Sequence, residues 1–363
     1  MNHLSIENFK QDMMVPIIIP AYEPDDRFVE LAQRLNESGT NYIIVVDDGS
    51  GEIYASIFRK VKSVFGDNCV VLHHEINKGK GAALKMAFRY VLNNYPDAVG
   101  VVTADSDGQH SVGCIQEVSN ALVQNKESLI LGVRCFEGDD IPWKSEMGNK
   151  ITRKVMKFVT GLDVSDTQTG LRGIPIGFME ELLDIKEDRF EFEMKMLLES
   201  IDKYPIVEVP IHTIYDSKEN HSTHFNPWID SIKIYKVLGG RFIRYVFSSL
   251  SSCIIDIVLF TIFCVIFKNT VFYYIALSTV LARLVSATYN CIINYKLVFK
   301  SDELFIRVIV KYAALVIVQM ATSAILVTGG VWTLKVIPET VVKIVVDTCL
   351  FFVSYTVQRK LVF

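Results

Sequence analysis

The sequence predicts an α/β domain with a mostly parallel sheet, followed by an all-α membrane domain of four helices. Three observations lead to this prediction. Short apolar runs alternate with helical patterns up to about residue 225, which is the order expected for βαβ units. Acidic and glycine-rich stretches follow directly after several of these runs. Beyond residue 240 charges become sparse, and four long apolar segments follow one another.

The first domain, residues 1–225, contains five runs that we expect to be strands. They are apolar throughout rather than alternating, which is typical of strands covered on both faces of a parallel sheet. Ligands bind such sheets at the carboxyl ends of the strands, so the residues that follow the runs are candidates for a site. The runs are 15–22, 42–50, 69–75, 98–107 and 128–134.

Helices are expected between these strands. Residues 25–38 begin with two aspartates, whose charge favours a helix N-terminus. Another helix opens at 77–84, NKGKGAAL, where glycines would let the backbone approach a nucleotide and Lys78 or Lys80 could reach phosphate. The spacing matches neither the dinucleotide nor the P-loop pattern. A solvated basic helix start is an equal alternative for either lysine alone.

The stretch 101–110, VVTADSDGQH, ends a predicted strand on two aspartates. Side chains two residues apart in a strand share a face, so Asp105 and Asp107 would project together past the sheet edge. Two carboxylates held this close repel unless a cation lies between them, and hard oxygen ligands suit Mg²⁺ or Mn²⁺. An acidic turn that caps the next helix is the alternative. Polar residues at the other strand ends favour a site.

Composition argues against several other classes. The 363 residues carry a formal net charge of −4 without a concentrated basic face, so no nucleic-acid partner is expected. Seven cysteines are scattered without CxxC spacing, which speaks against zinc or a disulfide framework. The first 14 residues lack an apolar core segment, so we expect no signal peptide and a cytoplasmic first domain.

The predicted membrane domain, residues 241–363, has four spans, each about long enough to cross ~30 Å of hydrocarbon. Lysine and arginine gather at one set of span ends, which predicts a multi-pass protein of the cell membrane with both termini cytoplasmic. The spans are 245–267, 272–293, 308–331 and 336–357. Residues 226–240 form an amphipathic pattern directly before the first span, which favours a helix in the membrane interface over an ordinary core helix.

An internal repeat divides the membrane domain into two helical hairpins. FIR at 242–244 recurs at 305–307, and KLVF at 296–299 recurs at 360–363. Ionisable residues inside the spans are costly and need partners. We expect Arg283 to pair with either Asp347 or Asp256. A salt bridge between helices is favoured for any single pair, whereas a polar path for a lipid headgroup stays open for the set as a whole.

Together, IIIPAYEP, VVDDGS, NKGKGAAL, TADSDGQH and DTQTGLRG resemble glycosyltransferase family 2, which has the GT-A fold. The likeness is strongest to its branch of dolichol-phosphate mannose synthases and polyprenyl-phosphate glycosyltransferases, and it covers about residues 15–235. The second half resembles a GtrA-type module, which is associated with lipid-linked sugars. The resemblance therefore implies a Rossmann-like GT-A domain fused to a membrane module of four helices.

The resemblance also implies roles for individual residues. Asp105, Asp107 and Gln109 correspond to the metal ligands, and Asp105 and Asp107 are also candidate catalytic residues. Asp166, in DTQTG, is a candidate catalytic residue that would organise the acceptor side. Positions that would hold the nucleotide sugar are Pro20, Ala21, Tyr22, Glu23, Asp48, Lys78, Gly79, Lys80, Ser106 and Arg134. Positions that would serve the acceptor phosphate are Arg134, Lys144, Ser145, Asn149 and Arg153. Glu191 and Glu193, in RFEFEM, are given no role beyond structure.

The implied activity is inverting, metal-dependent transfer of a sugar from a nucleotide-diphosphate sugar, with UDP favoured, to polyprenyl phosphate for cell-envelope glycosylation. A phosphate monoester is largely anionic at neutral pH, so no strong general base is needed. A homo-oligomer is expected from the same resemblance. The alternatives are a flippase or receptor for lipid-linked sugar with a non-catalytic sugar domain, and a processive polysaccharide synthase. The latter would carry a Gln-x-x-Arg-Trp motif, and no tryptophan here follows an arginine.

Overall fold

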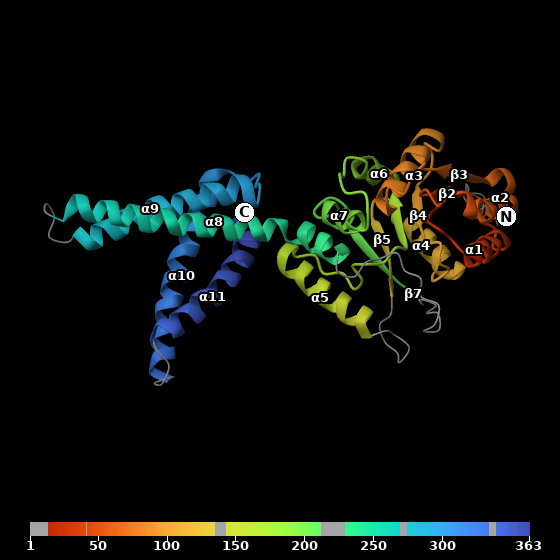
Figure 1. The fold of residues 1–363 in the computed structure, drawn as a ribbon. Coiled ribbons are helices and arrows are strands. Elements are labelled where there is room, and N and C mark those ends of the chain that lie inside the picture. The colour runs from red at the N-terminus through yellow and green to blue at the C-terminus, as the bar shows by residue number, and fades with distance from the viewer. Residues whose placement is uncertain (1–13, 41, 135–142, 212–228, 269–273, 334–338) are drawn as a thin grey trace, which may run out of the picture. The chain divides into compact units, whose positions relative to one another are not determined.

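The computed structural model describes residues 14–40, 42–134, 143–211, 229–268, 274–333 and 339–363. Residues 1–13, where we expected no signal peptide, lie outside the described residues. The chain divides into two compact units, Met1–Leu238 and Gly239–Phe363, which are described separately below. Figure 1 shows the helices and strands of both.

The first unit is built on a sheet that has, within the described residues, seven strands in the order β3-β2-β1-β4-β6-β5-β7. All five predicted strands are confirmed as β1 to β5, and the expectation of a mostly parallel sheet holds. The strands are β1 (Ile17–Ala21), β2 (Ile43–Asp47), β3 (Cys69–His73), β4 (Gly100–Thr103), β5 (Leu129–Arg134), β6 (Arg172–Pro175) and β7 (Ile206–Ile211).

The strands β6 and β7 are additions to the predicted sheet. β6 lies between β4 and β5 and is antiparallel to both, whereas β5 pairs with β7 in parallel. Because β4 and β5 both oppose β6, they run in the same direction. The carboxyl ends of β1 to β5 and β7 therefore face the same edge of the sheet.

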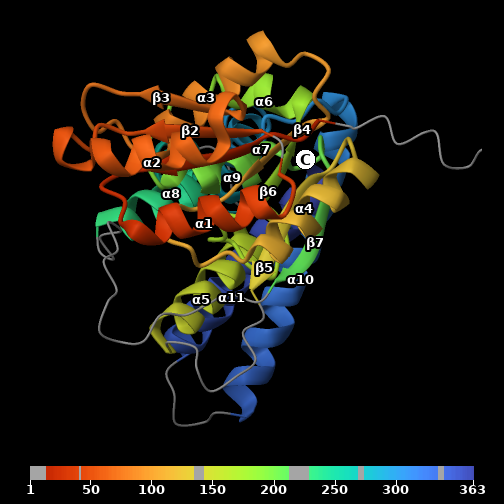
Figure 2. The same ribbon diagram turned by 90° about the vertical axis from the view of Figure 1, so that its right-hand side faces the viewer.

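Helices cover both faces of the sheet, which explains why the strands are apolar throughout. In β1, Ile17 and Ile19 belong to one core and Ile18 to the other, as the alternation of strand side chains requires. Helices on the two faces complete the two cores: mainly α1 (Asp26–Glu37), α2 (Ala55–Phe65) and α4 (Val112–Gln124) on one, and α3 (Lys80–Asn94), α6 (Ile176–Leu182) and α7 (Glu191–Glu199) on the other. In Figure 2, α3 and α6 lie on one side of β2, and α1 and α4 lie on the other.

Two helix starts in the first unit are predicted from the sequence, and a helix begins at each, as α1 and α3. The helix predicted over 25–38 is α1, and the side chain of Asp25 caps it by accepting the amide proton of Arg27 at 3.0 Å. The helices are α1 (Asp26–Glu37), α2 (Ala55–Phe65), α3 (Lys80–Asn94), α4 (Val112–Gln124), α5 (Trp143–Thr160), α6 (Ile176–Leu182) and α7 (Glu191–Glu199).

The second unit is helical throughout its described residues. Its boundary with the first unit falls within α8, so residues 229–240 of the predicted interfacial stretch are the first turns of that helix, and 226–228 lie outside the described residues. The helices are α8 (Ile229–Phe267), α9 (Tyr274–Ile293), α10 (Phe305–Thr333) and α11 (Glu339–Val357).

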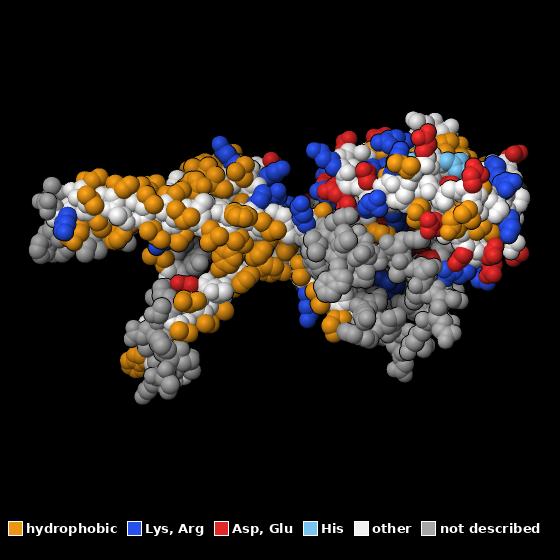
Figure 3. All heavy atoms as spheres, in the orientation of Figure 1, with side chains coloured by type: hydrophobic (Ala, Val, Ile, Leu, Met, Phe, Trp, Pro, Cys, Tyr) orange, Lys and Arg blue, Asp and Glu red, His pale blue; other side chains and the backbone are white. Residues whose placement is uncertain are grey.

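Two of the described helical segments, Lys236–Phe267 and Phe305–Gly330, are long and apolar enough to cross a membrane. Large apolar side chains point outward from this unit, for example Phe247 and Val265, which are 68% and 74% exposed. On the face seen in Figure 3, hydrophobic side chains cover much of the unit. The segments before α9 and α11, at 269–273 and 334–338, lie outside the described residues. Four spans therefore stay a prediction.

The two copies of the sequence repeat meet in the structure. In each repeat the first three residues of KLVF end a short π-helix, and the phenylalanine follows it. The two π-helices are Asn294–Val298 and Gln358–Val362. The side-chain amide of Asn294 donates to Gln358 Oε1 at 2.9 Å, and the rings of Phe299 and Phe363 stack with centroids 4.9 Å apart. Equivalent residues of the two repeats thus contact each other.

Polar side chains inside the second unit bond to one another. The structure contains an ion pair between Arg283 and Asp256, one of the two that the sequence leaves open, with nitrogen and oxygen 3.4 Å apart. Ser286 donates to the same carboxylate at 2.7 Å. Tyr312 donates to Asn290 Oδ1 at 2.7 Å. Such contacts are expected where polar groups lie between apolar helices.

Gly100 tests the close approach of β4 and β6. A Cβ at this position would clash with the backbone of Ile174 and Pro175. We expect Gly100→Ala to destabilise the first unit by about 1–3 kcal/mol, because the backbone of β6 must shift. Gly113→Ala is the matched control, since a Cβ there meets only Ser111 Oγ at 3.8 Å. Thermal unfolding of the full chain in detergent measures both, and equal melting temperatures would contradict the close approach.

Candidate active site

The loops after β1, β2 and β3 are tied together by Asp48. Its Oδ1 accepts the amide proton of Lys78 at 3.0 Å and its Oδ2 that of Gly79 at 2.8 Å. His74 Nδ1 lies 2.7 Å from Oδ1. Asp48 is 3% exposed, so the predicted donor residue is also the structural anchor of the loop that opens α3.

The residues at the end of β1 form the neighbouring wall. Pro20 and Ala21 belong to β1 and are buried, whereas Tyr22 is half-buried and Glu23 is exposed. Glu23 has a positive φ of 50°, and its amide donates to Ser50 Oγ at 2.8 Å. A hydrogen bond to Glu23, together with burial, raises the pKa of Tyr22. The β1 and β2 loops are therefore held in one arrangement.

The cation beside Asp105 in this structure is Lys80. The Nζ atom of Lys80 lies 2.7 Å from Asp105 Oδ1 and 2.9 Å from Glu193 Oε1. His110 Nε2 lies 3.5 Å from the other oxygen of Asp105. Gly170 leaves room for this carboxylate, because a Cβ at that position would overlap its atoms. The sequence suggested a metal ion between the aspartates, and the protein itself provides a positive charge to one of them.

Burial and charge act in opposite directions on this ion pair. Burial alone would raise the pKa of Asp105, but the ammonium of Lys80 and the hydrogen bond to His110 outweigh it and lower that pKa. Burial likewise would lower the pKa of Lys80, and the carboxylates of Asp105 and Glu193 outweigh it and raise that pKa. Both partners are therefore charged at neutral pH.

Asp107 has a different environment. Its Oδ1 accepts the amide proton of Gln109 at 3.1 Å, which closes the turn after Ser106. Burial, and then the negative charge of Asp105, raise the pKa of Asp107. An additional cation at this carboxylate would relieve that repulsion.

The carboxylates of Asp105 and Asp107 fit a divalent ion that takes its other ligands from elsewhere. They are hard oxygen donors, as Mg²⁺ and Mn²⁺ prefer, and Asp107 lacks the lysine contact that Asp105 has. Within the described residues, no group of three or more His, Cys, Asp or Glu side chains converges as a complete metal cage. An ion here would therefore need oxygens from a ligand such as a diphosphate, and from water.

Arg134 and Asp166 form a buried, two-point ion pair. Arg134 Nε and one terminal nitrogen lie 2.6 and 3.0 Å from the two oxygens of Asp166, whose side chain is fully buried. Asp166 also accepts the amide proton of Gln168 at 3.0 Å. This pair joins the end of β5 to the loop before β6. The predicted roles of both residues toward donor and acceptor stay predictions.

The other predicted acceptor residues hold the same loop or lie apart. Asn149 is 3% exposed and donates to the carbonyl of Ser165 at 2.9 Å, while its own oxygen accepts from Thr167 at 3.2 Å. Arg153 pairs with Asp163 at 3.1 Å. The side chains of Lys144 and Ser145, at the start of α5, lie outside the described residues. The predicted role of these residues toward the acceptor phosphate stays a prediction.

Two residues at the site were not predicted. Glu193 contacts Lys80, and Arg172 lies fully buried behind it, with one terminal nitrogen 2.7 Å from the main-chain oxygen of Glu193. Burial lowers the pKa of Arg172 despite the nearby carboxylates of Glu193, Asp166 and Asp105. Glu193 lies in the stretch RFEFEM and Arg172 in TGLRG. No pattern within either stretch predicts a contact with Lys80.

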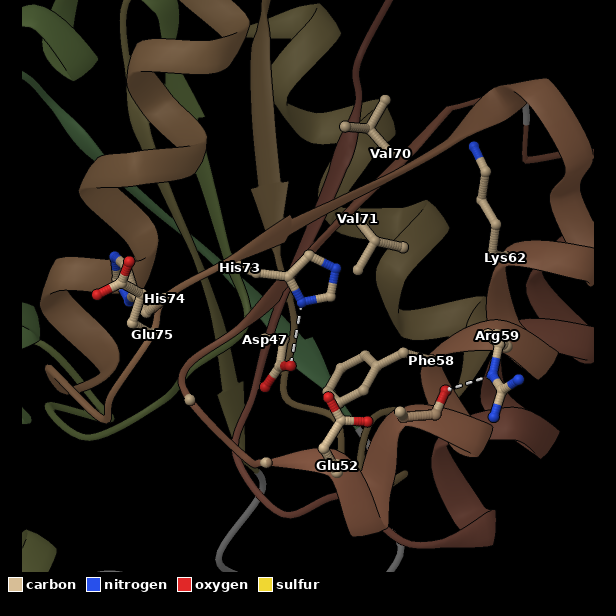
Figure 4. A pocket seen from close by; sticks show the side chains of 13 residues that line it. Asp47, Glu52, Phe58, Arg59, Lys62, Val70, Val71, His73, His74 and Glu75 are labelled. Carbon is tan, nitrogen blue, oxygen red and sulfur yellow. Dashed lines mark hydrogen bonds and ion pairs between the residues drawn. The ribbon is translucent and has the colours of Figure 1, made fainter.

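A pocket of about 630 Å³ lies beside the site rather than in it. It is lined mainly by α2 and the ends of β2 and β3, with Phe58 and Val71 among its apolar residues. Figure 4 shows the ring of His73 turned toward Asp47, with which it bonds at 3.1 Å. None of the predicted donor, metal or acceptor residues lines this pocket, so it is not the candidate active site.

Residues 17–183 match the family described as Glycosyl transferase family 2, and this part of the chain is a domain of that family. An uncharacterized protein of Methanocaldococcus jannaschii is 27% identical over 204 residues, 55% of this chain and 81% of the relative. A UDP-N-acetylglucosamine–dolichyl-phosphate N-acetylglucosaminyltransferase of Methanococcus voltae is 26% identical over 56% of this chain and 87% of the relative. A polyprenol monophosphomannose synthase of Mycolicibacterium smegmatis is 24% identical over 54% of this chain and 75% of the relative.

Asp107 should oppose folding when no cation is bound. Its raised pKa means that the folded state binds a proton more readily than the unfolded state, so the stability linked to this group is gained as pH falls through the folded-state pKa and lost as pH rises. Without divalent ions at neutral pH, we expect Asp107→Asn to raise the melting temperature by a small amount, on the order of a few degrees. Its advantage should shrink as pH is lowered.

The control for this measurement is Asp67→Asn, since Asp67 is an exposed carboxylate away from the site. That substitution should leave the melting temperature unchanged. A lower melting temperature for Asp107→Asn at neutral pH would show that the carboxylate stabilises the fold, contrary to the argument from its surroundings.

Proposed function

We propose that the chain is a membrane-bound inverting glycosyltransferase that moves a sugar from a nucleotide-diphosphate sugar, with UDP favoured, to polyprenyl phosphate. The observation that carries this proposal is the carboxylate pair Asp105–Asp107 beside the fixed ammonium of Lys80, at the edge where the strands of a family 2 domain end. Two relatives support a polyprenyl-type phosphate as the acceptor. One is named as a transferase of N-acetylglucosamine to dolichyl phosphate, and the other as a polyprenol monophosphomannose synthase.

The donor would bind at the edge formed by β1, β2 and the start of α3. Tyr22, Glu23 and Asp48 would face the nucleoside, and Lys80 would face the diphosphate from the point where it contacts Asp105. Asp105 and Asp107, with Gln109, would hold Mg²⁺ or Mn²⁺. When bound, that ion would supply Lewis-acid stabilisation of the diphosphate leaving group.

The transfer needs one new bond and one broken bond. A phosphate oxygen of the acceptor attacks the anomeric carbon of the sugar, and the bond from that carbon to the diphosphate oxygen breaks. The nucleoside diphosphate leaves with the electron pair, and the configuration at the carbon inverts. Because the acceptor phosphate is already anionic near neutral pH, the protein need only orient it and support the leaving charge.

The acceptor phosphate would need cationic groups near the donor diphosphate. Arg134, at the end of β5, is 16% exposed and keeps a fixed orientation through Asp166. We assign Asp166 the role of holding Arg134 toward the acceptor, rather than contact with the reacting atoms. Lys144, Ser145, Asn149 and Arg153 remain candidates for the acceptor side.

The second unit would place this site at the bilayer that contains the acceptor. The two long apolar helical segments and the outward apolar side chains support membrane insertion. We propose four spans of the cell membrane, a GtrA-like arrangement of two hairpins and cytoplasmic termini, which match the distribution of Lys and Arg along the sequence. Assembly into a homo-oligomer and a role in cell-envelope glycosylation belong to the same proposal.

The test is an assay of the full chain in lipid nanodiscs with polyprenyl phosphate, Mn²⁺ or Mg²⁺ and a panel of UDP- and GDP-sugars. We expect one donor to give both free nucleoside diphosphate and a new glycolipid, dependent on the metal. Asp107→Asn should lower turnover by roughly 100-fold or more, since it removes a carboxylate that would hold the metal ion beside the leaving diphosphate. Asp67→Asn should retain full activity.

Other outcomes point to other functions. Release of nucleoside diphosphate without glycolipid would mean that the acceptor is not polyprenyl phosphate. No turnover with any donor, from folded protein that still binds the lipid, would reject the transferase and favour a receptor or flippase for lipid-linked sugar.

A further inference from the structure

Glu193 contacts the site but has no role in the transfer described above. Its Oε1 lies 2.9 Å from Lys80 Nζ, the same atom that lies 2.7 Å from Asp105. The Lys80 side chain is 16% exposed and that of Glu193 is 11% exposed, so this contact is largely shielded from water. A carboxylate in such a place is costly unless it is paired, which points to a defined role for the contact.

The backbone around Glu193 is fixed from two directions. Arg172 donates to the main-chain oxygen of Glu193 at 2.7 Å and to that of Thr169 at 2.9 Å. The neighbouring Phe192 is fully buried and lies so close to Gly81 that a Cβ on Gly81 would overlap it. The start of α7 is thereby held against the start of α3, where Lys80 is located.

Two carboxylates on one ammonium restrict where that ammonium can be. A lysine side chain has a flexible four-carbon stem, and a single partner leaves it free to follow that partner or to turn away. With Glu193 as a second partner, Nζ stays at one point beside Asp105. A group that stabilises charge on a ligand is most effective when it is held in place before the ligand arrives.

We propose that Glu193 is a positioning residue for the nucleoside-diphosphate group of the donor, which it serves by holding the ammonium of Lys80. This inference rests on the proposed function and adds to it a residue of α7 that does not touch the donor. Removing the charge of Glu193 should weaken nucleotide binding only as long as Lys80 is present.

The test is calorimetric binding of UDP and of GDP, each with Mn²⁺, to the full chain in detergent, using whichever nucleotide the wild type binds more tightly. We expect Glu193→Gln to weaken binding about tenfold. Glu193→Asp, which keeps the charge, should recover part of the loss. In a Lys80→Met background, Glu193→Gln should change the affinity by less than about twofold, as expected for residues that act through one contact.

The matched control is Glu199→Gln, on the same helix, where Glu199 pairs with Lys195 at 2.8 Å instead of with the site. It should bind nucleotide as the wild type does. Melting temperatures establish that each variant is folded. If Glu193→Gln does not fold, Glu193→Asp carries the test, because its shorter side chain should weaken binding in the Lys80 background and have no effect with Lys80→Met.

Two results would overturn the inference while leaving the proposed function intact. One is unchanged nucleotide affinity in folded Glu193→Gln, and the other is an equal loss of affinity with and without Lys80. A wild type that binds neither UDP nor GDP in the presence of Mn²⁺ would overturn the proposed function and the inference together.

Discussion

The contact between Lys80 and Asp105 is the interaction on which the rest of the candidate site depends. It joins the end of β4 to the start of α3, and Glu193 extends it to α7. Asp48 holds the loop that leads to Lys80, and Gly170 leaves the space that the carboxylate of Asp105 occupies. If Lys80 were displaced, Asp105 would be a half-buried carboxylate beside Asp107, and the repulsion between the two would no longer be compensated. The positive charge that the aspartates after β4 depend on is thus provided by a different element, the start of α3.

Some charged side chains of the site have close partners of opposite charge, whereas the charged form of Asp107 is disfavoured. This difference is what a cation-binding site needs. Arg134 and Asp166 form a two-point pair, and Lys80 has two carboxylate partners. Asp107 has a raised pKa because burial and Asp105 disfavour its charged form. A carboxylate that is unfavourable by itself, and that would become favourable beside a bound cation, would be an example of stability given up for function.

The sheet and part of the site could be predicted from sequence because their signals are local. Apolar runs marked β1 to β5, and the polar residues after these runs, including Asp105, Asp107 and Lys80, lie at one edge of the sheet. The strands β6 and β7 were missed because Arg172–Pro175 is short, with a charged residue, a glycine and a proline, and Ile206–Ile211 also contains charge and proline. The pairs Arg134–Asp166 and Lys80–Glu193 could not be predicted either. Their members are far apart in the chain, and only the insertion of β6 and the packing of α7 on α3 bring them together.

The position of bound Mn²⁺ would decide whether Asp105 and Asp107 hold the ion beside Lys80. A structure of the full chain with Mn²⁺ and UDP, determined by crystallography with the anomalous signal of manganese, would locate the ion and the diphosphate independently of turnover. We expect one manganese peak between the carboxylates of Asp105 and Asp107 and the diphosphate oxygens, with the ammonium of Lys80 beside the same diphosphate. Manganese or nucleotide bound elsewhere, for example in the pocket lined by Phe58 and His73, would contradict this expectation.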